Sequence, residues 1–258
     1  MSKIICIANQ KGGVGKTTTA VNLAAALAAS ERPTLLVDID PQGNATSGVG
    51  LDKSRLAHSI YDLLINQIEP EALVVDTGHP YLHILPATSD LAGAELELAA
   101  EEGREQRLKH ALAALAERYR YILVDCPPSL NLLTVNAMTA ADSVLIPLQC
   151  EFYAMEGLSQ ILHTINLVKR GLNPLLQIEG ILLTMFDSRG NLGRDVAAEI
   201  RTHFPQELFE TVVPRNIRLA EAPSHGRPVI YYDITSKGAA AYLQLAREMI
   251  QREETPSA

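Results

Sequence analysis

The chain has 258 residues, of which 47% are hydrophobic, and it carries a formal net charge of −8 at pH 7. This length and apolar content are sufficient for one large α/β domain, and no linker divides the sequence. The acidic balance argues against a globally basic nucleic-acid-binding protein, although it leaves room for a local basic patch. No apolar run is long enough to cross a bilayer, and the N-terminus leads directly into a predicted strand with no space for a signal peptide. We therefore expect a cytoplasmic protein.

Nearly continuous runs of Val, Ile and Leu recur along the chain, and helical patterns fill most of the intervals. Such runs are typical of strands that helices cover on both faces. The sequence therefore predicts a doubly wound, mostly parallel α/β sheet in a single domain over residues 1–258, with a frayed tail at 252–258. The predicted strands are residues 4–8, 34–38, 82–86, 121–125, 143–148, 178–185 and 211–213.

A glycine-rich loop joins the first predicted strand to an alanine-rich helical pattern, and residues 9–18 read NQKGGVGKTT. The glycines allow a tight turn that directs backbone N–H groups at a polyphosphate, and the positive end of the following helix adds its dipole. In such a loop Lys16 reaches the β- and γ-phosphates and the Thr17 hydroxyl binds Mg²⁺. The predicted nucleotide-binding residues of the loop are Lys11, Gly12, Gly13, Val14, Gly15, Lys16, Thr17 and Thr18.

The loop departs from the strict phosphate-binding pattern at one position. Gln10 stands where the pattern has a glycine, six residues before Lys16, and a second lysine, Lys11, precedes the glycine pair. A lysine at this position resembles the signature lysine of the deviant P-loop ATPases, which reaches across a dimer interface to the partner's nucleotide. The alternative is a flexible glycine loop with solvated lysines, but strand, loop and helix follow one another in the order that the motif requires.

Three aspartates close two of the predicted strands. Asp38 and Asp40 lie on the same side of one strand at its carboxyl end, where ligands of such sheets bind. Asp38 either forms the turn ahead of Pro41 or takes part in chemistry, whereas Asp40 is the candidate that positions the attacking water. The run at 121–125 ends in Asp125, the Walker B arrangement, whose carboxylate is expected to hold Mg²⁺ through water.

The cysteines Cys6, Cys126 and Cys150 are far apart in the sequence and lie in apolar segments. Their odd number and the lack of a CxxC pair favour buried, reduced thiols over disulfides. The same features argue against a zinc or iron–sulfur site, so we expect metal chemistry only from the Mg²⁺ site.

Six segments resemble the ParA/Soj/MinD group of deviant Walker ATPases, and specifically the chromosomal Soj-type ParA partition proteins. The resemblance covers essentially the whole chain. It implies an ATPase with ATP and Mg²⁺ as cofactors, a homodimer with ATP at its interface, and non-specific binding of double-stranded DNA on the nucleoid by the ATP-bound dimer. It also implies weak hydrolysis that a ParB-type centromere-binding protein stimulates. The segments are KGGVGKTTTAVNLA, LLVDIDPQGNATSG, LPATSDLAGAELEL, VDCPPSLNLLTVNA, PLQCEFYAMEGLSQ and VVPRNIRLAEAPSHGRPVI.

The resemblance also gives roles to single residues. It implies that Lys11 acts on the phosphates of the partner subunit, that Lys16 and Thr17 bind phosphate and Mg²⁺ within one subunit, and that Asp40 supports hydrolysis. The candidate catalytic residues are therefore Lys11, Lys16 and Asp40.

Two further pairs of residues match family positions in the C-terminal third. Pro214 and Asn216 match the segment that lines the adenine, and Arg189 and Arg218 resemble the DNA-binding arginines. The residues themselves do not reveal this second pair, because the segment 187–227 holds six arginines and six acidic residues and is neutral. Without the resemblance each arginine reads as a solvated surface residue.

The nearest alternative is a MinD-like membrane-cycling ATPase of division-site placement. It requires a C-terminal amphipathic helix that binds lipid, whereas here the final helical pattern, 238–252, leads into an acidic tail with a proline, so we expect no membrane partner. An electron-transfer ATPase resembling the nitrogenase iron protein needs paired cysteines on the dimer axis, and Cys126 has no suitably placed second thiol in the sequence. A repressor resembling larger plasmid ParA proteins needs an N-terminal helix-turn-helix domain, which we do not expect here.

Overall fold

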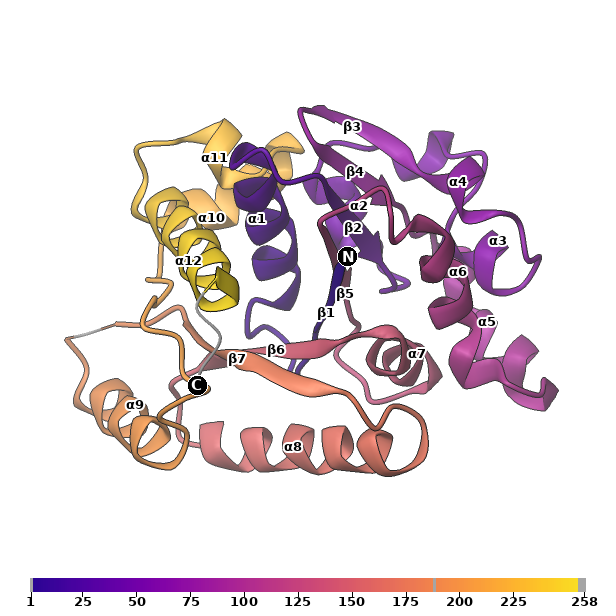
Figure 1. Ribbon diagram of the computed structural model, residues 1–258. Helices are drawn as coiled ribbons and strands as arrows, with labels where there is room; N and C mark the ends of the chain where they lie inside the picture. The colour runs from indigo at the N-terminus through magenta and orange to yellow at the C-terminus, as the bar shows by residue number, and fades with distance from the viewer. Residues whose placement is uncertain (1, 188, 255–258) are drawn as a thin grey trace.

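The computed structural model describes residues 2–187 and 189–254, and its centre is one sheet of seven strands in the order β3-β4-β2-β5-β1-β6-β7. Neighbouring strands run parallel except β3 and β4, and helices cover both faces (Figure 1). The predicted doubly wound α/β fold is therefore confirmed. The strands are β1 (Lys3–Ile7), β2 (Thr34–Asp38), β3 (Val75–His79), β4 (Leu82–Leu85), β5 (Tyr121–Asp125), β6 (Ser143–Gln149) and β7 (Gln177–Thr184).

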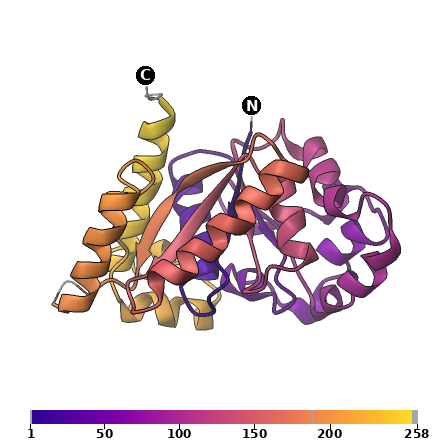
Figure 2. The same cartoon turned by 90° about the horizontal axis from the view of Figure 1, so that it is seen from below.

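Each face of the sheet buries its own core. One core packs the strands on α1 (Lys16–Ala29), α11 (Val229–Tyr232) and α12 (Lys237–Glu254). The other packs them on α3 (Ile60–Leu64), α6 (Arg107–Leu115), α7 (Leu132–Ala140), α8 (Ala154–Gly171) and α9 (Asn191–His203). Figure 2 shows α8 lying across the sheet, where it contacts β6. The remaining helical segments are α2 (Asn44–Gly48), α4 (Pro70–Leu73), α5 (Ala94–Glu97), α10 (Ile217–Glu221), η1 (Lys53–Arg55), η2 (Ser89–Ala92), η3 (Leu98–Ala100), η4 (Arg104–Gln106) and η5 (Ala222–His225).

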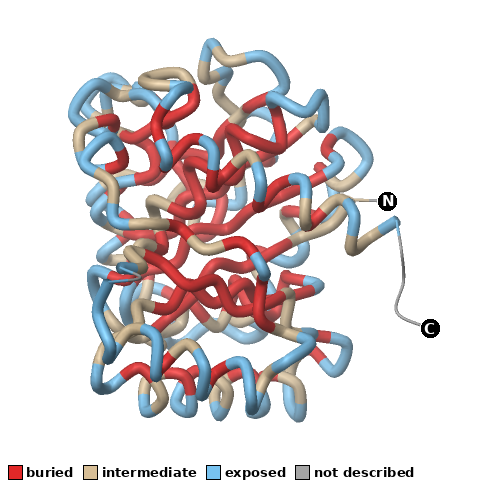
Figure 3. Tube along the Cα trace, turned by 90° about the vertical axis from the view of Figure 1, so that its left-hand side faces the viewer, coloured by how far each residue is buried: buried red, intermediate tan, exposed pale blue. Residues whose placement is uncertain are grey.

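The central strands explain the continuous apolar runs of the sequence. Every residue of β2 and of β5 is buried, and the buried chain forms a continuous layer inside an exposed shell (Figure 3). In β1, Cys6 belongs to one core and its neighbours Ile5 and Ile7 to the other, since successive side chains leave a strand on opposite faces. Alternation of polar and apolar residues is absent because both faces are dry.

The edge strand β3 is absent from the predicted strands. Its sequence, VDTGH, is polar and only partly buried, and it pairs antiparallel with β4 after a turn in which Tyr81 has a φ of 61°. Because β3 has one neighbouring strand and is only partly covered, it lacks the apolar run by which the buried strands are recognised.

The prediction of a strand at 211–213 is wrong. The backbone of Val213 does bond to the edge of β7, donating to Leu183 O at 2.8 Å. However, the carboxylate of Glu248 in α12 accepts the N–H groups of Glu210 and Thr211, each at 2.9 Å. Because these two donors point to a side chain rather than to β7, no regular ladder forms, and the segment follows β7 through isolated bridges.

The tail also differs from the expectation over residues 252–254, which continue α12 as a regular helix. Arg252 stacks over the Phe209 ring at 4.3 Å and donates to Leu208 O at 3.0 Å. Glu253 forms an ion pair with Lys3 at 3.2 Å, which ties the helix to β1. These contacts hold the last described turn in place, and residues 255–258 lie outside the described residues.

Candidate nucleotide-binding site

The glycine-rich loop connects the carboxyl end of β1 to the N-terminus of α1. Gly13 and Gly15 have φ angles of 75° and 87°, a conformation that other residues adopt only at a cost. Three side-chain hydrogen bonds fix the loop to its neighbours. Asn9 donates to Pro147 O at 2.8 Å and accepts from the Lys11 N–H at 3.0 Å, and the Thr184 hydroxyl donates to Val14 O at 2.7 Å. Loop shape is thus set by the ends of β6 and β7 as well as by the glycines.

Lys16 folds back into the loop, where its ammonium donates to Lys11 O at 3.1 Å. The residue is only 6% exposed, and no carboxylate forms an ion pair with it in the described part of the chain. Burial lowers the pKa of Lys16, and the nearby Asp125 and Asp40 oppose that shift. A buried ammonium within a glycine-rich loop at the N-terminus of a helix fits an anion such as a phosphate.

Asp125, at the end of β5, is fully buried between β1 and β2. Neither of its carboxylate oxygens has a hydrogen-bond partner of normal geometry among the described residues. Burial and the neighbouring Asp38 raise the pKa of Asp125 well above its usual value, while the Thr17 hydroxyl acts in the opposite direction. Buried polar atoms without partners are rare in proteins. The pair of Asp125 and Thr17 therefore fits a hydrated Mg²⁺, an ion with oxygen ligands.

Asp38 and Asp40 have different surroundings. Those of Asp38 distinguish a structural role from a chemical one. Asp38 accepts hydrogen bonds from the Asp40 N–H at 3.1 Å, the Thr46 N–H at 2.8 Å and the Thr46 hydroxyl at 2.7 Å. Burial raises the pKa of Asp38 to about 6. The residue fastens α2 to β2, which favours the structural interpretation. Asp40 uses one oxygen to accept from the Gln42 N–H at 2.9 Å, and it faces the same end of the sheet as Lys16.

A cavity of about 210 Å³ opens beside the loop. Its lining includes Pro214 and Asn216, the two residues that the sequence predicts to bind the base. Asn216 also caps α10, since its side-chain oxygen Oδ1 accepts from the Arg218 backbone N–H at 3.1 Å. The cavity adjoins the N-terminus of α1, so a base held there would place its phosphates towards the loop. The lining residues are Gly15, Thr18, Thr184, Met185, Val213, Pro214, Arg215, Asn216, Leu219, Ala220 and Tyr242.

Comparisons with known proteins decide the family. Residues 2–178 match the family model of an AAA domain. Over 257 residues the chain is 59% identical to the chromosome partitioning protein ParA of Myxococcus xanthus, covering 100% of this chain and 91% of that protein. It is 56% identical over 249 residues to the sporulation initiation inhibitor protein Soj of Bacillus subtilis, covering 96% of this chain and 98% of that protein. The chain belongs to the ParA/Soj family of chromosome-partitioning ATPases.

A solved structure of similar fold holds a nucleotide and magnesium. The cobyrinic acid a,c-diamide synthase of Mycobacterium smegmatis, solved with bound ADP and magnesium, superimposes with a TM-score of 0.87 at 39% identity, covering 100% of this chain and 97% of that one. Its identity to this chain is lower than that of the ParA and Soj relatives. No helix in the described ranges is long and apolar enough to cross a membrane.

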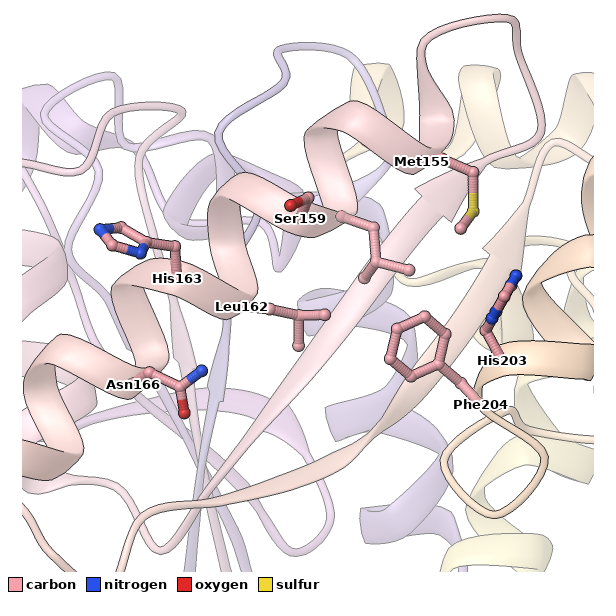
Figure 4. Close-up of a pocket in the computed structure, with 8 residues that line it drawn as sticks. Met155, Ser159, Leu162, His163, Asn166, His203 and Phe204 are labelled. Carbon is pink, nitrogen blue, oxygen red and sulfur yellow. The ribbon is translucent and has the colours of Figure 1, made fainter.

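A second cavity, of about 560 Å³, lies between α8 and α9 and has no part in the ParA/Soj nucleotide site. In Figure 4 the side chains of Leu162 and Phe204 lie close to each other across it. None of its lining residues belongs to the phosphate loop or to the ends of β2 and β5. They are Met155, Leu158, Ser159, Leu162, His163, Asn166, His203 and Phe204.

The two arginines that the ParA/Soj resemblance singles out lie on neighbouring segments, because Phe186 pairs with Pro214. Arg189 is 88% exposed and donates to both carboxylate oxygens of Asp187, at 2.9 and 2.8 Å. Arg218 bonds to Glu221 at 2.8 Å and to Asp233 at 3.1 Å. Both guanidinium groups therefore share their charge with carboxylates in this state.

Two contacts near the ParA/Soj site are not predicted from the sequence. Glu151, two residues after the end of β6, forms an ion pair with Lys11 at 2.5 Å. Cys6 and Cys126, far apart in the sequence, lie side by side behind the loop as buried free thiols with 3.3 Å between their sulfur atoms. Both contacts depend on β1 lying between β5 and β6, and strand order is the information that the sequence pattern lacks.

Proposed function

We propose that the chain is a DNA-partition ATPase whose ATP-bound form is a sandwich dimer that binds duplex DNA without sequence preference. The observation that carries the proposal is that the ammonium groups of two lysines of the loop lie in different surroundings. The Lys16 ammonium lies inside the phosphate loop of its own subunit, whereas the Lys11 ammonium points away from the loop to Glu151, with 38% of the Lys11 side chain exposed. A second cation at the rim of an anion site is suited to the phosphates of another subunit.

ATP and Mg²⁺ are the cofactors of this site. The triphosphate would be held by the loop residues 11–18, with Lys16 at the β- and γ-phosphates, and the base by Pro214 and Asn216. Thr17 and Asp125, the latter through water, are the residues that would hold Mg²⁺. When bound, Mg²⁺ neutralises charge on the phosphate oxygens.

Hydrolysis depends on Asp40 in this proposal. Its carboxylate lies at the end of β2, close to Lys16, where it can orient a water molecule for attack on the γ-phosphate. Charge that develops in the transition state requires a cation, and Lys11 is engaged by Glu151 in the free subunit. We therefore propose slow turnover by the free protein and faster turnover when a ParB-type partner and DNA are present.

DNA binding has to overcome the net charge of the chain, which is −8. Dimerisation doubles every positive contact on one face, so Arg189 and Arg218 of two subunits can together follow a phosphate backbone that a single subunit would hold too weakly. We therefore propose that the ATP-bound protein lies in the cytoplasm, on the nucleoid.

The MinD-like alternative requires a C-terminal helix that is free to bind lipid. Here the apolar face of α12 is used inside the protein. Tyr242, Leu245 and Met249 are buried in the core that α12 shares with α1. This packing supports the partition function over membrane cycling.

Sedimentation velocity of the hydrolysis-deficient variant Asp40→Ala tests the dimer. It is expected to sediment as a dimer in saturating ATP with Mg²⁺ and as a monomer in ADP. Added to this background, Lys11→Ala should bind nucleotide through Lys16 but remain monomeric, whereas Lys16→Ala should lose nucleotide binding itself. An Asp40→Ala protein that stays monomeric in saturating ATP contradicts the sandwich dimer.

A further inference from the structure

Lys11 has an ionic partner within its own subunit. Its ammonium lies 2.5 Å from the Glu151 carboxylate, with 38% and 46% of the two side chains exposed. Glu151 lies two residues after the end of β6, and β6 is a neighbour of β1, so the pair joins two adjacent loops at the carboxyl ends of these strands. Since an ion pair this exposed is weak, it holds Lys11 in place without preventing its release.

The backbone of Lys11 is held by two hydrogen bonds that do not involve its ammonium. Its N–H donates to Asn9 at 3.0 Å, and its carbonyl accepts from Lys16 at 3.1 Å. Only the side chain has to turn for the ammonium to leave Glu151. A phosphate offers that ammonium more negative charge than one carboxylate does.

Two exposed aromatic residues come directly after Glu151. Phe152 is 75% exposed and Tyr153 is 64% exposed, and their rings meet edge to face with 5.0 Å between centroids. Tyr153 is the N-cap residue of α8, so the pair is attached to a regular helix. Large exposed aromatic side chains on a rigid support are typical anchors of protein interfaces.

The position of the aromatic pair argues for a second copy of this chain as the occupant. The pair is continuous in sequence with Glu151, which holds the one residue expected to cross the dimer interface. Surfaces that adjoin Lys11 must meet the other subunit when Lys11 reaches its nucleotide. The pair therefore lies where a dimer interface would cover it.

We propose that residues 151–153 form a dimerisation switch: Glu151 retains Lys11 in the free subunit, and Phe152 and Tyr153 pack against the second copy once Lys11 turns to that copy's γ-phosphate. This inference rests on the sandwich dimer of the proposed function. The inference adds to that dimer one residue that opposes dimerisation, Glu151, and two that favour it, Phe152 and Tyr153.

Sedimentation equilibrium in ATP and Mg²⁺, in the Asp40→Ala background, tests the switch with two variants. Phe152→Ser with Tyr153→Ser is expected to weaken the dimer by about tenfold or more. Glu151→Gln, which keeps the shape of the side chain but not its charge, is expected to tighten the dimer by about two- to fivefold. Leu175→Ser is the matched control, because Leu175 is 83% exposed and precedes β7, at the amino ends of the strands rather than at their carboxyl ends.

Binding of a fluorescent ATP analogue and thermal unfolding show whether each variant remains folded and loaded. If the Asp40→Ala parent does not dimerise, the proposed function itself fails. If the parent dimerises and the double serine variant dimerises as tightly, the aromatic surface is refuted while the sandwich dimer stands. A Glu151→Gln dimer weaker than the parent refutes the retaining role of Glu151.

Discussion

At the scale of single residues, the two candidate DNA-binding arginines differ from free cations. Arg189 is bonded to Asp187 and Arg218 to Glu221 and Asp233, all near the protein surface. Surface ion pairs of this kind contribute little to stability, but each carboxylate lowers the positive potential that a DNA backbone meets. The affinity for DNA should therefore depend on the acidic partners as much as on the arginines.

Replacing either arginine should weaken DNA binding without affecting the nucleotide site. We expect Arg189→Ala and Arg218→Ala each to weaken ATP-dependent binding by about fivefold to tenfold on duplexes of unrelated sequence. The salt dependence should become shallower, because each lost phosphate contact removes about 0.9 from its slope. Mobility shifts across a salt series measure both effects. Arg118→Ala is the control, since Arg118 precedes β5 at the amino ends of the strands, away from both arginines. Unchanged affinity and slope in both test variants would remove Arg189 and Arg218 from the DNA site.

Replacing the acidic partner should have the opposite effect. Asp187→Asn removes a negative charge next to Arg189 and keeps the size of the side chain. We expect it to strengthen ATP-dependent DNA binding by a few-fold at low salt, with the gain disappearing as salt screens the charges. Weaker binding by Asp187→Asn would show that Asp187 is needed to orient Arg189 rather than masking it.

At the scale of elements, Glu248 connects α12 to the segment beside β7. Burial raises the pKa of Glu248, but its hydrogen bonds from Thr211 and from the Glu210 backbone outweigh burial and lower the pKa below its usual value. Because the folded pKa is below the unfolded one, the carboxylate stabilises the fold above the unfolded pKa of about 4.3. That contribution is lost as the pH falls through the folded pKa.

The Glu248→Gln variant should therefore lose stability in a pH-dependent way. We expect a free energy of unfolding about 1–2 kcal/mol lower than that of the wild type at pH 7, because a charged acceptor of two backbone N–H groups becomes neutral. The difference should shrink as the pH drops below about 4. Urea unfolding at a series of pH values measures it, with Glu117→Gln on an exposed turn as control. A difference that is independent of pH would mean that packing, not charge, is the contribution of Glu248.

The elements also show where sequence patterns suffice. The phosphate loop is predictable because strand, glycines, lysine and helix are consecutive, so the local order already implies the geometry of Gly13, Gly15 and Lys16. The segment 211–213 has the same apolar character as a strand, but its backbone donors are taken by Glu248 on α12. A contact between segments 37 residues apart cannot be inferred from the pattern of either one.

At the scale of the whole molecule, the sheet order determines what the site contains. The ends of β2 and β5 carry Asp40 and Asp125, and the sequence alone marks both as strand-terminal carboxylates. The ion pair of Lys11 with Glu151 joins residues 140 positions apart, and it exists because β6 lies next to β1. Motifs therefore predict the candidate residues of the site, whereas topology determines which distant residues contact them.

A binding surface that forms on assembly reconciles the acidic composition with DNA binding. The central claim is that ATP, by joining two subunits, creates that surface. The most direct measurement is the binding of wild-type protein to a duplex of arbitrary sequence with ATP and Mg²⁺, with ADP and Mg²⁺, and without nucleotide. The account predicts salt-sensitive binding with ATP and little or none in the other two states. Equal affinity in all three states, or none with ATP under conditions where the dimer forms, would contradict it.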